Sequence, residues 1–193
     1  MSKVKSIAVF CGSSDGTKPV FKEAAYNLGK SLAEHGISLV YGGGSRGLMG
    51  SCARGCSENK GHVIGVIPKF LYDVPAVKPG VYESELIVTK NMHERKSIMC
   101  ERADAFIALP GGIGTFEEIF EQMAWLQLRL HNKVCGFLNV DGFYNDLKNF
   151  LLHAVDNGFT RQAVFDSVQF ESNPDMLIEK IEGTTINLPP KIC

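Results

Sequence analysis

Short apolar runs alternate along this chain with longer segments of helical period. This alternation is typical of βαβ units, in which helices cover the strands of a mostly parallel sheet. Most of the runs are continuously apolar, as expected for strands that are buried on both faces. The pattern therefore predicts an α/β fold, with strands expected at 6–10, 38–41, 62–67, 85–89, 105–109, 134–139 and 167–170.

Helices are expected between these runs. Gly36 is a typical C-terminal stop for the first helix, and Asn173 followed by Pro174 is a typical start for the last one. The segment 68–84 has the weakest pattern, and a loop of this length in a compact domain is either a lid or binding loop or a surface excursion without a role. The helices are predicted at 18–35, 46–59, 91–103, 115–130, 144–156 and 174–182.

The bulk composition restricts the class of protein. With 193 residues, 45% of them hydrophobic, the chain is expected to form a single domain over 1–193. A net charge of −1 with mixed signs gives no field that would attract nucleic acid or an anionic membrane, so neither partner is expected. The first apolar run is too short for a signal peptide or a membrane span, which favours a cytoplasmic protein.

The six cysteines form no C-x-x-C pair, and reduced thiols are expected. Cys52, Cys56 and His62 have a spacing with which a metal site is conceivable. Small buried thiols are much more common than such sites, so no metal site is predicted.

Three of the turns that follow strands are rich in glycine and serine. They read C-G-S-S at 11–14, G-G-G-S-R-G at 42–47 and P-G-G-I-G-T at 110–115. Glycine lets a backbone approach a phosphate closely, and a helix start offers free N–H groups and a positive dipole end. Because parallel strands present their carboxyl ends at one edge, the three turns predict a phosphate site there.

The type of phosphate ligand is narrowed by two missing motifs. The one G-x-G-x-x-G match follows the second strand, and Asp73 lies at a poor distance for a ribose contact, so a dinucleotide fingerprint is absent. A G-x-x-x-x-G-K-[ST] loop for a nucleoside triphosphate is also absent. The site suits a monophosphate.

Glu118 has two interpretations. With Thr115 as N-cap, Glu118 stands three residues on and completes a capping box. Alternatively, a carboxylate in the first helical turn stays ionised beside the helix dipole, where it can stabilise a cation or orient water.

The helix expected at 91–103 places Met92, Arg95, Lys96 and Met99 on one face. This face is either a solvated basic patch beside core methionines or part of a ligand site. Because the helix follows a strand, its start lies at the same edge as the glycine turns, which favours the second interpretation.

Together, G-G-G-S-R-G-L-M-G at 42–50, M-H-E-R-K at 92–96 and P-G-G-I-G-T-F-E-E at 110–118 resemble the Lonely Guy (LOG) family of cytokinin riboside 5′-monophosphate phosphoribohydrolases. The likeness runs in matching order from about Ile7 to Asp146. It implies a Rossmann-like, doubly wound fold and hydrolysis of the N-glycosidic bond in a nucleoside 5′-monophosphate, with no metal or redox cofactor.

The resemblance also assigns site residues. The family's catalytic arginine and glutamate fall on Arg95, which contacts ribose and departing base, and on Glu118, which stabilises the ribosyl centre and orients water. Where plant members carry Pro-Arg-Glu, this chain has P-K-F at 68–70, which favours a broader enzyme that accepts AMP. The candidate substrate- and phosphate-binding residues are Ser13, Gly43, Gly44, Ser45, Met92, Lys96, Gly111, Gly112, Ile113, Gly114, Thr115 and Glu117.

Two other functions compete with hydrolysis of a nucleotide. Relatives are also labelled lysine decarboxylases, but a pyridoxal phosphate enzyme needs a Schiff-base lysine and an acidic partner for the pyridine nitrogen, and neither is identifiable. A non-catalytic nucleotide sensor or carrier can use the same scaffold. Arg95 and Glu118 favour a hydrolase, because a pure binding protein has little use for a carboxylate near a phosphate.

The helix expected at 115–130 also predicts a partner. One stripe, formed by Phe116, Ile119, Phe120, Met123, Leu126 and Leu130, is expected in the core. Ala124, Trp125 and Leu128 form a second stripe, and a helix with two apolar stripes usually buries the second against another element or subunit. With the family's habit of dimerising, this predicts a homodimer.

Overall fold

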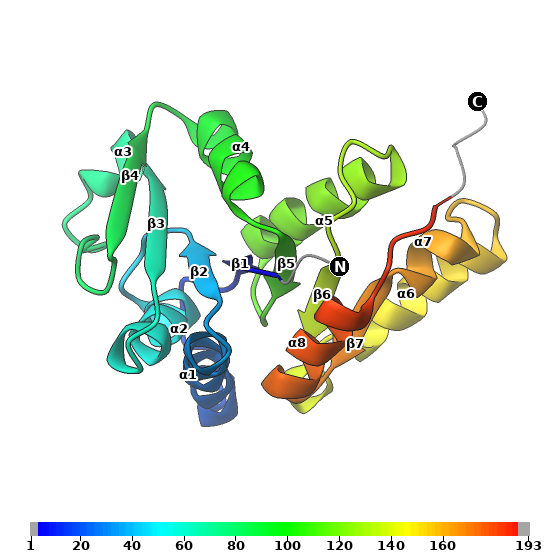
Figure 1. The fold of residues 1–193 in the computed structure, drawn as a ribbon, viewed down its shortest axis with the longest axis horizontal. Helices are drawn as coiled ribbons and strands as arrows, with labels where there is room; N and C mark the ends of the chain where they lie inside the picture. Colours follow the sequence, from blue (N-terminus) through cyan, green and yellow to red (C-terminus); the bar gives the residue numbers. More distant parts are fainter. Residues whose placement is uncertain (1–3, 189–193) are drawn as a thin grey trace.

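The computed structural model describes residues 4–188 and contains a seven-stranded sheet (Figure 1). The strands are β1 (Ser6–Phe10), β2 (Ser38–Tyr41), β3 (Val63–Pro68), β4 (Glu85–Thr89), β5 (Ala105–Ala108), β6 (Cys135–Leu138) and β7 (Val168–Glu171). Their spatial order is β4-β3-β2-β1-β5-β6-β7, and every neighbouring pair is parallel. The predicted parallel α/β fold is confirmed.

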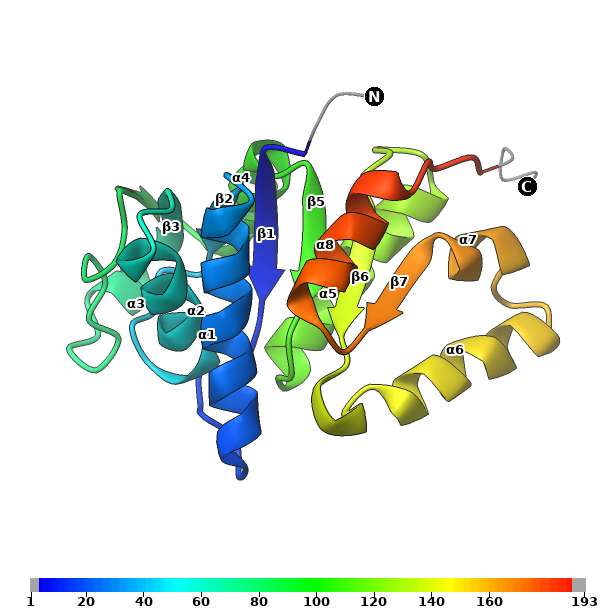
Figure 2. The ribbon, with the colours of Figure 1, turned by 60° about the horizontal axis from the view of Figure 1, so that its bottom comes forward.

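Helices cover both faces of this sheet. They are α1 (Pro19–Glu34), α2 (Gly47–Glu58), α3 (Lys69–Tyr72), α4 (Met92–Arg102), α5 (Ile113–Gln127), α6 (Asn145–Asp156), α7 (Gln162–Asp166) and α8 (Pro174–Gly183), with a 3₁₀ turn at Val140–Gly142. Figures 1 and 2 show α1, α2 and α8 on one face and α4 and α5 on the other. Alternate residues of each central strand therefore enter two separate cores, as Ile7 and Val9 do on one side and Ala8 and Phe10 on the other.

The central strands are mostly apolar because both of their faces are covered. All residues of β3 and β5 are buried, whereas β4 and β7, at the two edges of the sheet, are only partly buried. None of the helices within residues 4–188 combines the length and the apolar character that a membrane span requires. Five cysteines are buried as free thiols, and Cys193 lies outside the described residues.

Several predicted boundaries need correction. The segment 68–84 contains the short helix α3, and α7 was not predicted at all. Helix α5 begins two residues before its predicted start and ends at Gln127, because Arg129 adopts a φ of 61° that no helix continues through. Leu130, expected in the core, lies beyond this end and is 67% exposed.

The strand order reverses between β1 and β5, which is where open α/β sheets bind ligands. Each of these strands is followed by one of the glycine turns. The two turns are joined, because the Gly12 N–H donates to the Pro110 carbonyl at 3.0 Å. The chain order of the strands thus places the predicted phosphate turns side by side at the carboxyl edge.

Candidate active site

A cavity of about 590 Å³ lies at this edge, between the glycine turns and the first turns of α4 and α5. Nine of the predicted site residues line it: Ser13, Gly44, Met92, Arg95, Gly112, Ile113, Gly114, Thr115 and Glu118. Five others lie beside it without lining it: Gly43, Ser45, Lys96, Gly111 and Glu117. The structure therefore brings residues from four separate segments of the chain into one space.

Arg95 and Glu118 form a buried ion pair in this cavity. The Arg95 Nη1 donates to Glu118 Oε1, and the residues are 5% and 7% exposed. Arg95 Nε also donates to the Val66 carbonyl at 3.0 Å, which fixes the guanidinium against the end of β3. The second carboxylate oxygen, Oε2, has no hydrogen-bond partner within residues 4–188 and is free for a ligand or water.

Gly42 explains how the guanidinium reaches this position. A Cβ on Gly42 would lie 2.4 Å from Arg95 Nη2, which is closer than such atoms approach. A larger residue at this point of the turn after β2 would have to displace the Arg95 guanidinium. The glycine turn after β2 therefore leaves space for the Arg95 side chain, in addition to its predicted role in binding phosphate.

The capping box expected at the start of α5 is wrong. The N-cap is Gly112, no side chain caps the helix, and Thr115 is already the third helical residue. Because the helix starts early, Glu118 lies one turn inside it, and its carboxylate reaches across to α4 instead of back to a backbone N–H. The first N–H groups of α5 thus remain available at the cavity, where the dipole favours an anion.

Lys96 and Glu117 form a separate charged group outside the cavity. The Lys96 amine donates to Glu117 and, at 2.9 Å, to Glu121 Oε1. Burial lowers the pKa of Lys96, but the hydrogen bonds to the two carboxylates outweigh it and raise the pKa overall. This lysine thus bridges α4 and α5 beside the Arg95–Glu118 pair.

Sequence reasoning missed the apolar wall of the cavity. This wall is formed by Cys11, Met49, Ile67, Leu71, Ala76 and Val77. Three of these residues belong to the segment 68–84, for which a binding loop was one of the two interpretations. Ser45 holds that segment in place, since its N–H and hydroxyl donate to the Val77 carbonyl at 3.1 and 3.0 Å.

Within residues 4–188, Cys11 is the one thiol on the cavity wall. Burial, followed by the nearby Glu118 carboxylate, raises the pKa of Cys11 far above its ordinary value. The sulfur is therefore a neutral thiol at physiological pH and a poor nucleophile. Among the lining groups, the Glu118 carboxylate paired with Arg95 is the better candidate for chemistry.

Comparison with known proteins identifies the family. Residues 49–181 match a family described as "Possible lysine decarboxylase". The chain is 47% identical over 181 residues to the cytokinin riboside 5′-monophosphate phosphoribohydrolase LOG7 of Arabidopsis thaliana, covering 94% of this chain and 82% of that protein. The chain belongs to the LOG family.

A second LOG phosphoribohydrolase, LOG2 of Arabidopsis thaliana, is 45% identical over 94% of this chain and 84% of its own length. Among solved structures, a molybdenum cofactor carrier protein from Chlamydomonas reinhardtii matches with a TM-score of 0.70 and 23% identity, covering 93% of this chain and 96% of that one. At this identity the carrier protein shows that the fold is shared. The LOG relatives are named as phosphoribohydrolases and therefore indicate the type of reaction.

Proposed function

We propose that the protein hydrolyses the N-glycosidic bond of nucleoside 5′-monophosphates, with cytokinin riboside 5′-monophosphates and AMP as substrates, to free base and ribose 5-phosphate. The observation that carries this proposal is the position of the Arg95–Glu118 pair in the same cavity as the uncapped start of α5. The LOG relatives, which are phosphoribohydrolases of cytokinin riboside 5′-monophosphates, support it.

In this proposal the substrate lies across the cavity. The 5′-phosphate binds the N–H groups and hydroxyl of residues 112–115 together with Ser13, because a helix start and hydroxyl donors favour an anion. The base packs against the apolar wall, where Met92, Ile67 and Leu71 offer flexible or aliphatic surface. The ribose then lies between these two ends, beside Glu118.

In the proposed chemical step, water attacks the ribosyl centre directly and no covalent bond forms between the protein and the substrate. The C1′–N bond breaks with its electron pair going to the base, which takes up a proton, and a water oxygen bonds to C1′ and loses a proton. Positive charge develops on the ribosyl ring, and the carboxylate of Glu118 stabilises it and orients the water. Arg95 holds this carboxylate and contacts the ribose and the departing base.

The proposed preference of the enzyme for particular bases depends on whether the first residues of the segment 68–84 reach the cavity. Lys69 pairs with Asp73 on the surface, and Phe70 is exposed, so neither contacts the cavity. The remaining wall is apolar and does not read hydrogen bonds on a particular base. We therefore propose that the enzyme accepts adenine as well as prenylated adenine.

We also propose a cytoplasmic homodimer. Ala124 of α5 and Leu128, the residue that caps the C-terminal end of α5, are exposed, in agreement with the predicted second apolar stripe. Trp125 instead packs partly against the core that lies between the sheet and α5. The exposed stripe is thus narrower than expected, and Leu128 is its largest member.

A substrate panel tests the proposed function. Purified protein is incubated with AMP, a prenylated AMP, adenosine and lysine, and free base, ribose 5-phosphate and cadaverine are measured. Base release is expected from the monophosphates, with a kcat/KM well above that for adenosine, because each charge-assisted hydrogen bond to phosphate contributes about 1.5–3 kcal/mol. Equal kcat/KM for AMP and adenosine would contradict the phosphate assignment, and tight AMP binding without base release would favour the sensor or carrier.

A further inference from the structure

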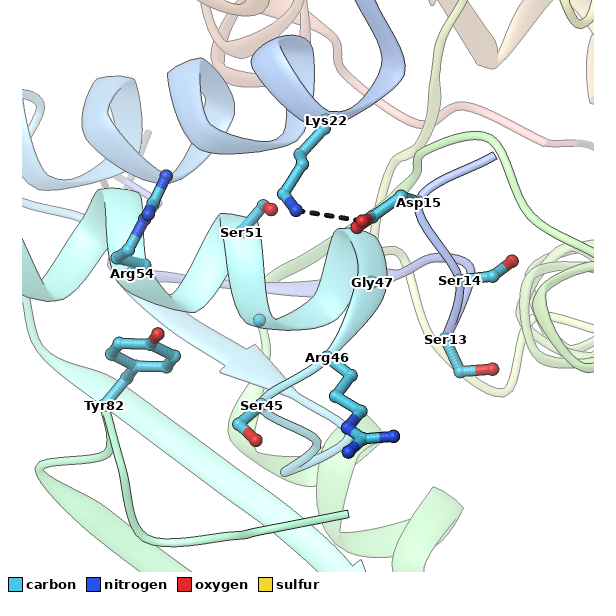
Figure 3. A pocket seen from close by; sticks show the side chains of 11 residues that line it. Ser13, Ser14, Asp15, Lys22, Ser45, Arg46, Gly47, Ser51, Arg54 and Tyr82 are labelled. Atoms are coloured by element: carbon cyan, nitrogen blue, oxygen red, sulfur yellow. Dashed lines mark hydrogen bonds and ion pairs between the residues drawn. The ribbon is translucent and has the colours of Figure 1, made fainter. Parts of the chain in front are cut away.

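A second cavity, of about 410 Å³, adjoins the catalytic one (Figure 3). Ser13 and Arg46 line both cavities and form the boundary between them. The second cavity is lined by Ser13, Ser14, Asp15, Lys22, Ser45, Arg46, Gly47, Gly50, Ser51, Arg54 and Tyr82. These residues come from α1, α2, the turns that follow β1 and β2, and the segment 68–84.

Positive charge dominates this second cavity. Three cationic side chains line it, Lys22, Arg46 and Arg54, against one acidic side chain, Asp15, which pairs with Lys22 at 2.9 Å. The Arg46 side chain has no ion pair or hydrogen bond in the described part of the chain. The cavity therefore carries two positive charges in excess over its own carboxylate.

Arg54 is only weakly neutralised. Its Nε lies 4.0 Å from Glu58 Oε1, one turn further along α2, and its guanidinium lies 5.1 Å from the centroid of the Tyr26 ring. Stacking on the ring leaves the N–H groups of a guanidinium available for an anion. The arginine is thus held in place at the cavity without a strong competing carboxylate.

Ser51 contributes a hydroxyl donor to the cavity. The residue is 4% exposed and lies in the middle of α2, and its hydroxyl has no hydrogen-bond partner within residues 4–188. In Figure 3 its oxygen points toward the Lys22 amine, into the cavity. Because this hydroxyl is open to the cavity and unpaired within the described residues, it can donate to an acceptor-rich ligand beside the cations.

We propose that this cavity binds a phosphate group separate from the 5′-phosphate that the proposed function assigns to the start of α5. Lys22 and Arg54 supply the charge, and Ser51 donates its hydroxyl hydrogen to a phosphate oxygen. Because Arg46 and Ser13 belong to both cavities, the second phosphate lies next to the nucleotide. It belongs either to a free phosphomonoester or inorganic phosphate, or to the terminal phosphate of a nucleoside diphosphate that spans both cavities.

The test counts phosphate sites by isothermal titration calorimetry with inorganic phosphate. The wild-type protein is expected to bind two equivalents, one in each cavity. The Lys22→Gln/Arg54→Gln double variant is expected to lose one equivalent, or to bind it at least about tenfold more weakly, because two charge-assisted bonds are removed. Ser51→Ala should weaken the same equivalent several-fold while changing no charge.

A matched control removes the same charges elsewhere. Lys30, also on α1, pairs with Glu34, and Arg102, at the end of α4, pairs with Glu85. The Lys30→Gln/Arg102→Gln variant is expected to retain both equivalents, which separates a local site from the general effect of lost charge. Titrations with ADP and AMP identify the molecule that carries the second phosphate. If a nucleoside diphosphate spans both cavities, Lys22→Gln/Arg54→Gln should bind ADP more weakly than the wild type does and should bind AMP equally well.

Three results would overturn the proposal. The first is a single phosphate equivalent in the wild type, and the second is two equivalents of unchanged affinity in both Lys22→Gln/Arg54→Gln and Ser51→Ala. The third is a raised KM for AMP in Lys22→Gln/Arg54→Gln without added phosphate, which would place the substrate's own 5′-phosphate in this cavity. If phosphate binds as expected but no base is released from AMP, the proposed function fails and the second site stands.

Discussion

The guanidinium of Arg95 in α4 is paired with the carboxylate of Glu118 in α5, and both side chains are buried at the carboxyl edge of the sheet. Water is largely excluded from the pair, so each charge depends on the other for its stabilisation. The pair therefore joins two helices that pack on the same face, and it orients the one carboxylate that faces the substrate cavity.

The first prediction concerns stability. Glu118→Gln should lower the free energy of unfolding by up to about 3–5 kcal/mol, because it leaves the Arg95 charge buried without a counter-charge. Glu118→Gln combined with Arg95→Met should recover much of the loss, since no unpaired charge then remains. Denaturant unfolding of the two single variants and the double variant measures this coupling. A loss below about 1 kcal/mol in Glu118→Gln would contradict a buried, interdependent pair.

The second prediction separates two neighbouring glycines. A Cβ on Gly112 meets no atom within 4 Å, so Gly112→Ala should fold normally while its methyl group enters the cavity and raises the KM for AMP. A Cβ on Gly111 would lie 2.1 Å from Thr115 Oγ1, so Gly111→Ala should lower the melting temperature. Melting curves and AMP kinetics are compared for both variants. An unchanged KM in a folded Gly112→Ala variant would remove this turn from the site.

The third prediction is a dependence of stability on pH. Burial, and after it the charge of Lys133, lowers the pKa of His131 from 6.5 to about 4. The unfolded chain binds this proton more tightly than the folded one, so the free energy of unfolding rises with pH between about 4 and 6.5. Lowering the pH from 7 to 5 should therefore lower the melting temperature, and His131→Asn should reduce that fall. The control is His153→Asn, at an exposed histidine, which should leave the fall in melting temperature between pH 7 and 5 unchanged. An equal effect of both variants would refute the assignment of this fall to His131.

The fourth prediction concerns the dimer. Leu128→Glu should weaken self-association, because it places a charge in the exposed stripe of α5 where apolar contact is expected. Phe159→Glu, at an exposed aromatic residue outside α5, is the matched control. Light scattering measures the mass of each variant. A dimer that survives Leu128→Glu and dissociates in Phe159→Glu would move the interface away from α5.

The sequence predicts the fold well because each central strand is apolar on both faces and each glycine turn follows a strand. It fails at α3 and α7, which are too short to show a helical period. It also misplaces Glu118, because the capping box is a local pattern, whereas the partner of Glu118 lies 23 residues earlier in another helix. A pairing between elements becomes visible only when the strand order brings α4 and α5 together.

The apolar wall of the cavity was not predicted for a similar reason. Leu71, Ala76 and Val77 carry no catalytic pattern, and their place depends on the hydrogen bonds from Ser45 that hold the segment. Arg46 stood in a recognised glycine turn, yet its position between two cavities is a property of the folded chain.

The role of Glu118 in catalysis is tested most directly by single-turnover release of adenine from AMP at saturating substrate. The rate for Glu118→Gln is compared with that for Glu117→Gln, which changes a neighbouring carboxylate that is paired with Lys96 outside the cavity. If the charge of Glu118 stabilises the ribosyl cation, its rate should fall about a hundredfold or more with AMP affinity retained, while Glu117→Gln stays near wild type. A near-wild-type rate in folded Glu118→Gln would contradict the proposed mechanism.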